Sequence, residues 1–501
     1  MVERQQMAAT PVDSASELAQ PASPTDRLPR KTSMKPHSDK PGKALSHQNQ
    51  RLRRCDNLKG QAHPQSGASA LRRRRRLPLT MERAANTTAN MTPSLSSPLA
   101  LPNGITLPNR LAKAAMEENM AESGQLPGAA IYQLYRAWSE GGAGLIITGN
   151  VMVDARALTG PGGIVLEADT PLEPFEEWAR VMRSHGAQAW VQISHPGRQV
   201  RAEMGGSVWA PSAVPLELGK HSKLFAQPKA MTAAEIDETI ERFAATAHAA
   251  EKAGFTGVEI HAAHGYLLSQ FLSPLANQRT DAWGGSLANR ARLLLDIVRA
   301  VRARVSDEFC VAVKLNSADF QRGGFSEDDA SQVVLWLNEL SVDLVELSGG
   351  SYESPAMQGR TADGRTLARE AFFLEFARTI AGIARMPIMT TGGIRRRAIA
   401  EDVLAGGIAV VGMATALAVA PDLPRDWLAG GQRVANIPPV EWQDKGMAGL
   451  ATMSLVKRYL WSFANGRKPA KHYSPLFSLI IDQWRLKQLA KRYRRWLNTR
   501  R

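Results

Sequence analysis

The sequence is poor in cysteine and contains no long hydrophobic run, and both deficits exclude classes of protein. Two cysteines, Cys55 and Cys310, occur in 501 residues. They are too few for a disulfide-built secreted domain and too far apart for a metal cluster, so they favour a reducing compartment such as the cytoplasm. No apolar stretch approaches the roughly 18–20 residues that a membrane-spanning helix needs. We therefore expect a soluble cytoplasmic protein, whose 44% hydrophobic residues suffice for a sizeable core.

Negative charge is scarce at both ends of the chain, although not in its middle. Residues 1–90 carry 17 Lys and Arg against 7 Asp and Glu, and residues 440–501 carry 14 against 3. The formal net charge of +15 therefore leaves residues 91–439 mildly acidic. A basic surface is the electrostatic requirement for nucleic-acid binding, and the globular middle does not have one. No nucleic-acid partner is expected.

Residues 1–90 lack apolar periodicity and are rich in Pro, Ser, Gln and Arg, including the run Arg72–Arg76. Such a segment buries too little apolar surface to offset its ordering entropy, so we expect a disordered basic extension. A transit peptide is the alternative, because Arg and Ser are plentiful. Its seven acidic residues and its length count against that reading.

From about residue 98, short apolar segments alternate with longer segments of helical spacing. Eight such units predict an α/β fold, a closed (β/α)₈ TIM barrel that spans residues 91–435. A doubly wound sheet would need a glycine-rich turn after its first strand, and Lys113–Asn119 has none. The expected strands are Leu111–Ala115, Gly144–Val151, Ala189–Ser194, Gly257–Ala262, Cys310–Asn316, Leu344–Ser348, Ile388–Gly392 and Ala409–Gly412.

Residues 436–501 are expected to form a helical, basic C-terminal appendage. Large apolar residues such as Trp484 and Tyr493 alternate there with Arg and Lys. One interpretation is a helix packed on the barrel with a solvated basic face. The other is a weak contact with an anionic surface, either a protein or a membrane.

Polar residues at the ends of the expected strands are the first candidates for chemistry, because TIM barrels place their active sites there. Gly393 and Gly412 follow strands seven and eight, where backbone N–H groups commonly bind phosphate. Glycine also ends strands for purely steric reasons. An amide such as Gln192 can pair with a pyrimidine edge, and the cation of Lys314 would stabilise an anionic reduced flavin.

The string His261-Ala-Ala-His264-Gly-Tyr266 follows the fourth strand. Two imidazoles that hydrogen-bond a substrate carbonyl would stabilise the enolate formed as hydride arrives, and Tyr266 would be the general acid. Zinc binding is an alternative, but no third ligand lies nearby in the sequence. In the remaining alternative, both histidines have a purely structural role and are satisfied by hydrogen bonds.

The segment Glu259–Arg290, EIHAAHGYLLSQFLSPLANQRTDAWGGSLANR, closely resembles the signature of the Old Yellow Enzyme (NADH:flavin oxidoreductase) family. The resemblance extends from about Leu99 to Pro424. It implies a barrel that binds FMN, takes electrons from NADH or NADPH, and reduces activated C=C bonds of α,β-unsaturated carbonyl compounds, which makes it an ene-reductase.

By position, the resemblance makes His261 and His264 the carbonyl-binding pair and Tyr266 the proton donor. It also assigns a set of residues to FMN, of which Ala115 and Met116 lie in the loop along the flavin. The others are Gln192 at the pyrimidine, Lys314 beneath the flavin, and Gly393, Gly412 and Met413 at the phosphate.

Three residues depart from the family pattern. Glu117 stands where many relatives have cysteine or threonine, and Lys314 and Met413 replace arginines. Lysine offers a point charge in place of a bidentate fork, so FMN is expected to be held more by backbone groups. Two other functions stay open: an NADH oxidase that passes electrons to oxygen or a quinone, and an inactive barrel tethered by its basic ends. The oligomeric state is also open.

Overall fold

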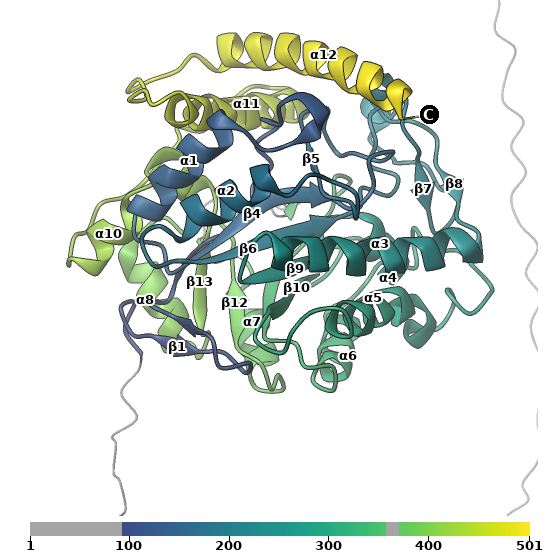
Figure 1. Ribbon diagram of the computed structural model, residues 1–501, viewed down its shortest axis with the longest axis horizontal. Helices are drawn as coiled ribbons and strands as arrows, with labels where there is room; N and C mark the ends of the chain where they lie inside the picture. Colours follow the sequence, from purple (N-terminus) through teal and green to yellow (C-terminus); the bar gives the residue numbers. More distant parts are fainter. Residues whose placement is uncertain (1–92, 357–369, 501) are drawn as a thin grey trace, which may run out of the picture. The chain divides into compact units, whose positions relative to one another are not determined.

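The computed structural model describes residues 93–356 and 370–500, and these contain a closed barrel of eight parallel strands (Figure 1). The pairing β13–β3 and the pairing β3–β4 close the ring, which confirms the predicted TIM barrel and excludes the doubly wound sheet. The barrel strands are β3 (Leu111–Lys113), β4 (Leu145–Met152), β6 (Gln188–Ser194), β9 (Gly257–Ala262), β10 (Cys310–Asn316), β11 (Leu344–Ser348), β12 (Ile388–Thr390) and β13 (Val410–Met413).

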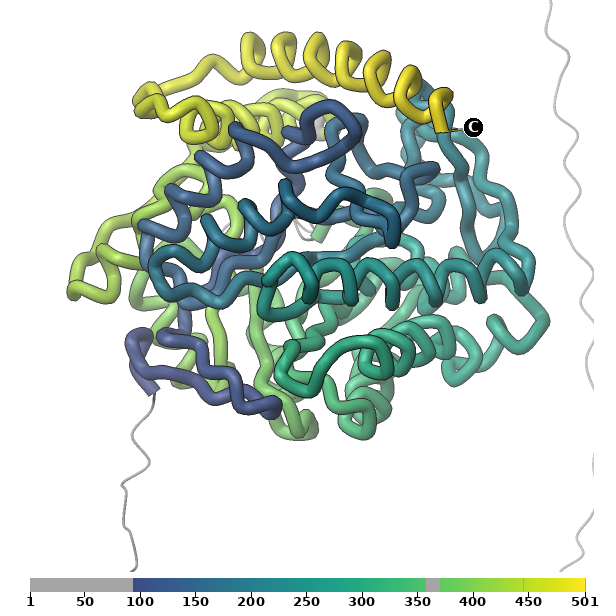
Figure 2. Tube along the Cα trace, in the orientation of Figure 1, coloured from purple at the N-terminus to yellow at the C-terminus, as the bar shows by residue number. Residues whose placement is uncertain are grey.

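Helices surround the barrel on the outside, as the tube view makes plain (Figure 2). Two of them begin with reciprocal capping boxes that fix their first turns: Thr232 with Glu235, and Ser326 with Asp329. The helices are α1 (Ala129–Glu140), α2 (Glu173–Arg183), α3 (Ala233–Lys252), α4 (Leu267–Leu272), α5 (Leu287–Arg302), α6 (Glu327–Leu337), α7 (Leu374–Ala381), α8 (Arg397–Ala405), α9 (Thr415–Val419) and α10 (Leu423–Leu428).

Alternation along each strand separates an outer core from the barrel interior. Val311, Val313 and Leu315 of β10 join the outer core between strands and helices. Ala312 points the other way, into an interior cluster that includes Trp190 of β6. The hairpin of β1 (Leu99–Ala100) and β2 (Thr106–Leu107) adds Leu101 and Leu107 to that interior cluster. Apolar packing therefore fills the amino-terminal part of the barrel and leaves the polar layer nearer the carboxyl ends of the strands.

The C-terminal appendage consists of two helices, α11 (Lys445–Ala464) and α12 (Pro475–Thr499), which pack against each other. α11 contacts α1, and α12 contacts the turns η1 (Ser123–Gln125) and η2 (Ala202–Met204). The Tyr493 hydroxyl donates to the Ala155 carbonyl at 2.8 Å. Among the described residues, no helix has the length and apolar character needed to cross a membrane. The predicted extension over residues 1–90 lies outside the described residues.

Smaller elements complete the described part of the chain. β5 (Ile164–Val165) pairs with the carboxyl end of β4. β7 (Trp209–Ala210) and β8 (Lys229–Ala230) form a separate two-stranded sheet, and η3 (Gly219–Leu224) lies between them in the sequence.

Candidate active site

A buried layer of charged and amide side chains spans the barrel interior. The ammonium of Lys314 lies 2.5 Å from Oε1 of Glu346, its register neighbour on β11. The amide nitrogen of Gln192 donates to Oε2 of Glu259 at 2.5 Å. All four side chains are buried. The second carboxyl oxygens of Glu259 and Glu346 accept no hydrogen bond from an N–H group within the described ranges, and the two carboxyl groups are close enough to share a proton.

The charge of this layer follows from burial. Burial raises the pKa of Glu259 well above its usual value, and the nearby charge of Glu346 raises it further. Burial opposes the charge on Lys314, but the carboxyls of Glu346 and Glu259 outweigh it and raise the lysine pKa. The Lys314 ammonium thus faces two buried carboxyl groups in this layer.

His261 and His264 lie next to each other at the carboxyl end of β9, with ring centroids 5.0 Å apart. The backbone N–H of Ala263 donates to Nδ1 of His261, so the proton of the neutral ring is on Nε2. Nε2 of His264 lies 2.7 Å from the Ser348 hydroxyl. Burial lowers the pKa of both histidines well below the usual value. Both rings are therefore neutral hydrogen-bonding groups at neutral pH.

The backbone of His264 explains why the second ring is placed so firmly. Its φ is +60°, a conformation that non-glycine residues seldom adopt, and its N–H donates to Oδ1 of Asn316 at 3.0 Å. If Ser348 donates to Nε2 of His264, the ring proton is on Nδ1 and that nitrogen is the free donor. The Ser348 hydroxyl in either case fixes the Nε2 side of the His264 ring.

Tyr266 begins the short helix α4, and its ring packs edge-on against His261 at 4.9 Å. Its hydroxyl lies 3.1 Å from the hydroxyl of Tyr352. Burial raises the Tyr266 pKa well above its ordinary value, and the charges of Tyr352 and Glu117 add to the effect. Tyr266 is thus protonated throughout the neutral range, as a proton donor must be.

The loop after β3 is fixed from two directions. On the barrel side, the Tyr135 hydroxyl of α1 donates to Oε1 of Glu118 at 2.5 Å, and buried Lys113 lies 3.7 Å from the same oxygen. From the other side, Arg485 of α12 donates to the carbonyl of Asn119 at 2.7 Å. The C-terminal appendage therefore stabilises the loop that contains Ala115, Met116 and Glu117.

Gly393 and Gly412 both lie at strand ends where a side chain has no space. Gly393 has a φ of +74°, and an added Cβ would come within 2.7 Å of the Phe372 ring. A Cβ on Gly412 would lie 2.5 Å from Met389 and from Thr391. The Met413 side chain, by contrast, is buried in the outer core, so only its backbone faces the barrel end.

These features fit FMN. The same buried layer holds the Gln192 amide, whose nitrogen alone is engaged by Glu259, and the Lys314 ammonium, so an acceptor and a cation are available for a heterocycle edge. Close packing requires glycine at the ends of β12 and β13, where backbone N–H groups would hold a phosphate. Groups of three or more His, Cys, Asp or Glu placed to hold a metal ion do not occur in the described part of the chain.

Comparison with known proteins identifies the arrangement. The model of the NADH:flavin oxidoreductase / NADH oxidase family matches residues 94–430. The chain belongs to this family. It is therefore an FMN-dependent NAD(P)H oxidoreductase, and α11 and α12 lie beyond the segment that the family model matches.

Individual relatives agree with the family assignment. The NADH-dependent flavin oxidoreductase iliE of Hypocrea jecorina is 38% identical over 352 residues, which are 66% of this chain and 88% of the relative. A relative of the same name from Neonectria sp. is 38% identical over 369 residues, 69% of this chain. The chain spans only 48% of that longer protein.

Solved structures give the same fold. A 2-naphthoyl-CoA reductase complex has a TM-score of 0.61 at 26% identity and covers 68% of this chain and 53% of its own. An old yellow enzyme homologue from Zymomonas mobilis has a TM-score of 0.60 at 24% identity, with 69% and 95% covered. Morphinone reductase has a TM-score of 0.56 at 22% identity, and the match covers 70% of this chain and 93% of morphinone reductase. The last two likenesses establish the barrel alone.

Proposed function

We propose that the protein is an ene-reductase, which adds two hydrogens across the C=C bond of an α,β-unsaturated carbonyl compound. The observation that carries the proposal is the neutral histidine pair beside a buried, protonated tyrosine at the strand ends of a flavin-family barrel. A pair of neutral donors suits a carbonyl oxygen that becomes negative in the transition state. A phenol beside them suits the carbon that must then receive a proton.

His261 and His264 bind the substrate carbonyl in this proposal. Nε2 of His261 carries the ring proton, and Nδ1 of His264 carries it when Ser348 donates to the opposite nitrogen. Because burial keeps both rings uncharged, each donates a hydrogen bond without giving up its proton. These bonds polarise the carbonyl, make the β-carbon electrophilic, and stabilise the enolate.

Tyr266 supplies the proton for the α-carbon. Tyr352 lies within hydrogen-bond distance, so its hydroxyl can orient the Tyr266 hydroxyl and replenish the proton after transfer. When bound, FMN would supply the hydride that the β-carbon receives, with NADH or NADPH as the source of electrons. The two additions together give the saturated carbonyl compound.

Gln192, Lys314 and the glycines are the residues that would hold FMN. The Gln192 amide nitrogen is engaged by Glu259, which leaves its carbonyl oxygen as an acceptor for an N–H of the pyrimidine edge. Lys314 would stabilise negative charge on the reduced ring, moderated by Glu346. Backbone amides at Ala115 and Met116, and at Gly393, Gly412 and Met413, complete the proposed set.

We also propose that the enzyme works in the cytoplasm. Cys310 is buried and unpaired, and burial raises the pKa of its thiol above the usual value, to about 12. A thiol that is both buried and protonated is a weak nucleophile, which suits a reducing compartment without requiring one.

The double variant His261→Ala/His264→Ala tests the assignment. We expect FMN to stay bound, because neither ring belongs to the proposed flavin set, while enone reduction slows by about 10²-fold or more as oxyanion donors are lost. His185→Ala, at an exposed histidine, is the matched control. Parent-like enone reduction by the double variant would refute the role, and rapid reoxidation by quinones but not enones would favour a quinone reductase.

A further inference from the structure

The outer face of α12 exposes large apolar side chains on its first turns. Leu476, Phe477, Ile480 and Trp484 are 58%, 57%, 56% and 65% exposed. Leu476, Ile480 and Trp484 are spaced by four residues, so they share one face of the helix. That face is turned away from the barrel, since α12 lies at the edge of the described structure (Figure 1). Large apolar side chains clustered on a surface commonly mark an interaction site.

The same outer face becomes basic along the second half of α12. Lysines and arginines replace the apolar residues there and are exposed. Asp482 is the one acidic residue of the helix, and it is buried. The exposed basic positions are Lys487, Lys491, Arg494 and Arg495. The helix therefore presents an apolar patch that continues into a strip of positive charge.

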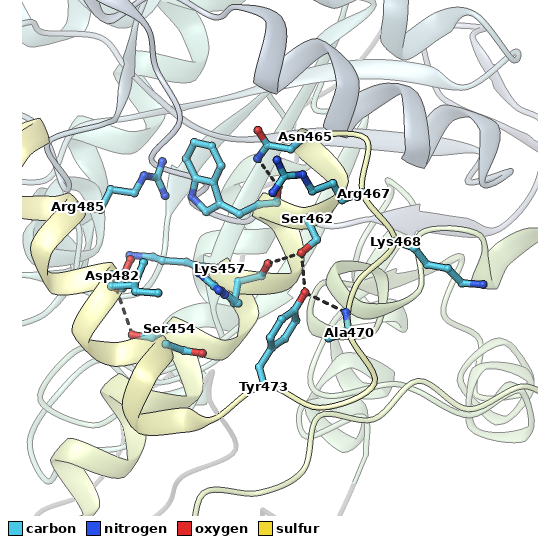
Figure 3. Close-up of a pocket in the computed structure, with 14 residues that line it drawn as sticks. Ser454, Lys457, Ser462, Asn465, Arg467, Lys468, Ala470, Tyr473, Asp482 and Arg485 are labelled. Atoms are coloured by element: carbon cyan, nitrogen blue, oxygen red, sulfur yellow. Dashed lines mark hydrogen bonds and ion pairs between the residues drawn. The ribbon is translucent and has the colours of Figure 1, made fainter. Parts of the chain in front are cut away.

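A cavity of about 440 Å³ opens beside the apolar patch, between α11, α12 and the segment that joins them (Figure 3). Its one carboxylate, Asp482, is neutralised by Lys457 at 3.5 Å and accepts a hydrogen bond from Ser454. Three other cations of the wall, Arg458, Arg467 and Lys468, form no ion pair with a carboxylate within the described ranges. Arg485 interacts with Asp482 and donates to the Asn119 carbonyl.

The cavity and the apolar patch form one continuous surface. The Arg458 guanidinium lies 5.5 Å from the ring centre of Tyr473 and 5.8 Å from that of Phe477. Tyr473 is itself fixed by hydrogen bonds with Ser462 at 2.7 Å and with the N–H of Ala470 at 3.0 Å. A ligand that spans the two regions would meet cations and apolar side chains within a few ångströms.

We propose that this surface docks the enzyme on a membrane that contains anionic phospholipids. The apolar patch enters the boundary between headgroups and acyl chains, and the cavity receives a lipid phosphate. Peripheral helices that bind in this way combine a Lys- and Arg-rich polar face with Trp, Phe and Leu. Anionic lipids attract each nearby cation, and Trp484 is a residue type that favours the membrane interface. This inference is independent of the redox reaction proposed above.

A second copy of the chain fits the surface less well. A two-fold dimer through this face would bring the same uncompensated cations against each other. A stable interface also needs about 800 Å² from each partner, far more than a patch of four side chains supplies. Charge complementarity therefore favours an anionic lipid surface.

Vesicle binding by the full-length holoenzyme tests the proposal. Sedimentation is measured with phosphatidylcholine vesicles and with vesicles of equal parts phosphatidylcholine and phosphatidylserine. We expect binding to the second kind only, decreasing with added salt. Phe477→Ser/Trp484→Ser and Arg467→Gln/Lys468→Gln should each lower the partition coefficient roughly tenfold or more. All four positions are exposed, so flavin content and the melting temperature should not change.

A control variant removes one apolar residue and one cation elsewhere, Leu335→Ser/Lys252→Gln, both exposed on α6 and α3. It should bind vesicles like the parent. Binding that is unchanged in the α12 variants would overturn the proposal and assign binding to another segment. So would binding of inorganic phosphate by a protein that sediments with neither kind of vesicle, or a dimer in ultracentrifugation that Phe477→Ser/Trp484→Ser dissociates.

Discussion

Replacing Tyr266 with phenylalanine isolates the proton-transfer step of the proposed mechanism. The substitution keeps the ring, which packs at 4.9 Å against His261, and removes only the hydroxyl that lies 3.1 Å from Tyr352. The histidine pair and the buried Lys314–Glu346 pair are untouched. The change therefore removes the general acid and leaves the carbonyl donors and the flavin residues in place.

The size of the expected loss follows from what a positioned acid contributes. General acid catalysis is worth about 10²–10⁴-fold, or roughly 3–5 kcal/mol of barrier. Because burial raises the pKa of Tyr266, the parent should be fully protonated and its enone reduction nearly independent of pH through the neutral range. The variant should be slower by that factor for enones with poor enolate stabilisation. Reduction of the flavin by NADH or NADPH needs no such proton and should barely change.

Stopped-flow absorbance at the flavin band measures the two half-reactions separately. Tyr352→Phe is the matched control, because it removes the neighbouring hydroxyl and keeps Tyr266. A loss confined to the oxidative half-reaction of Tyr266→Phe, with a smaller loss in Tyr352→Phe, is the expected result. Equal losses in both half-reactions would show that Tyr266 shapes the site without donating a proton.

Three further predictions concern the buried layer and the histidines. Burial lowers the pKa of His195 to about 4, whereas an unfolded histidine titrates near 6.5. The free energy of unfolding should therefore fall by up to about 3 kcal/mol as pH decreases from 6.5 to 4. Denaturant unfolding should show a smaller pH dependence of this free energy in His195→Asn than in the parent. Glu346→Gln leaves Lys314 uncompensated and should raise the flavin midpoint potential, by about 30 mV for each 1.4 kcal/mol of added stabilisation of the reduced form. An unchanged potential in a dye-coupled redox titration would show that the Lys314 charge does not stabilise the reduced flavin. Ser348→Ala should weaken enone binding by about tenfold at constant flavin content, because His264 loses the hydrogen bond that holds its Nε2 side; parent-like binding would contradict that role.

The sequence predicted the barrel closely because each strand is a short apolar segment. The predicted strands at 257–262, 310–316 and 344–348 have the observed bounds, and the other five differ by one or two residues at one or both ends. Local hydrophobic pattern decides where a strand lies, but the exact end depends on which backbone groups find partners across the barrel.

The candidate site was predictable in part. Lys314 stood out as a charge inside an apolar strand, and the same signal was present at Glu259 and Glu346, which were missed as members of the site. Strand register then joins Lys314 to Glu346, which no single strand reveals. Ser348, which contacts His264, gives no such pattern, and neither does Tyr352 in a loop.

The C-terminal appendage was predicted as helical and basic, and two helices are observed. Its contact with the loop after β3, through Arg485 and the Asn119 carbonyl, joins residues more than 360 positions apart. Nothing local in either segment indicates such a pairing, because it depends on where the barrel carries the loop.

The central claim is that the bound flavin passes hydride to an activated C=C bond. Its most direct test reduces the purified holoenzyme with one equivalent of NADH or NADPH without oxygen and then mixes it with 2-cyclohexenone. The flavin band should return, and one cyclohexanone should form for each flavin reoxidised. A flavin that stays reduced with the enone and is reoxidised only when oxygen or a quinone is admitted would contradict it.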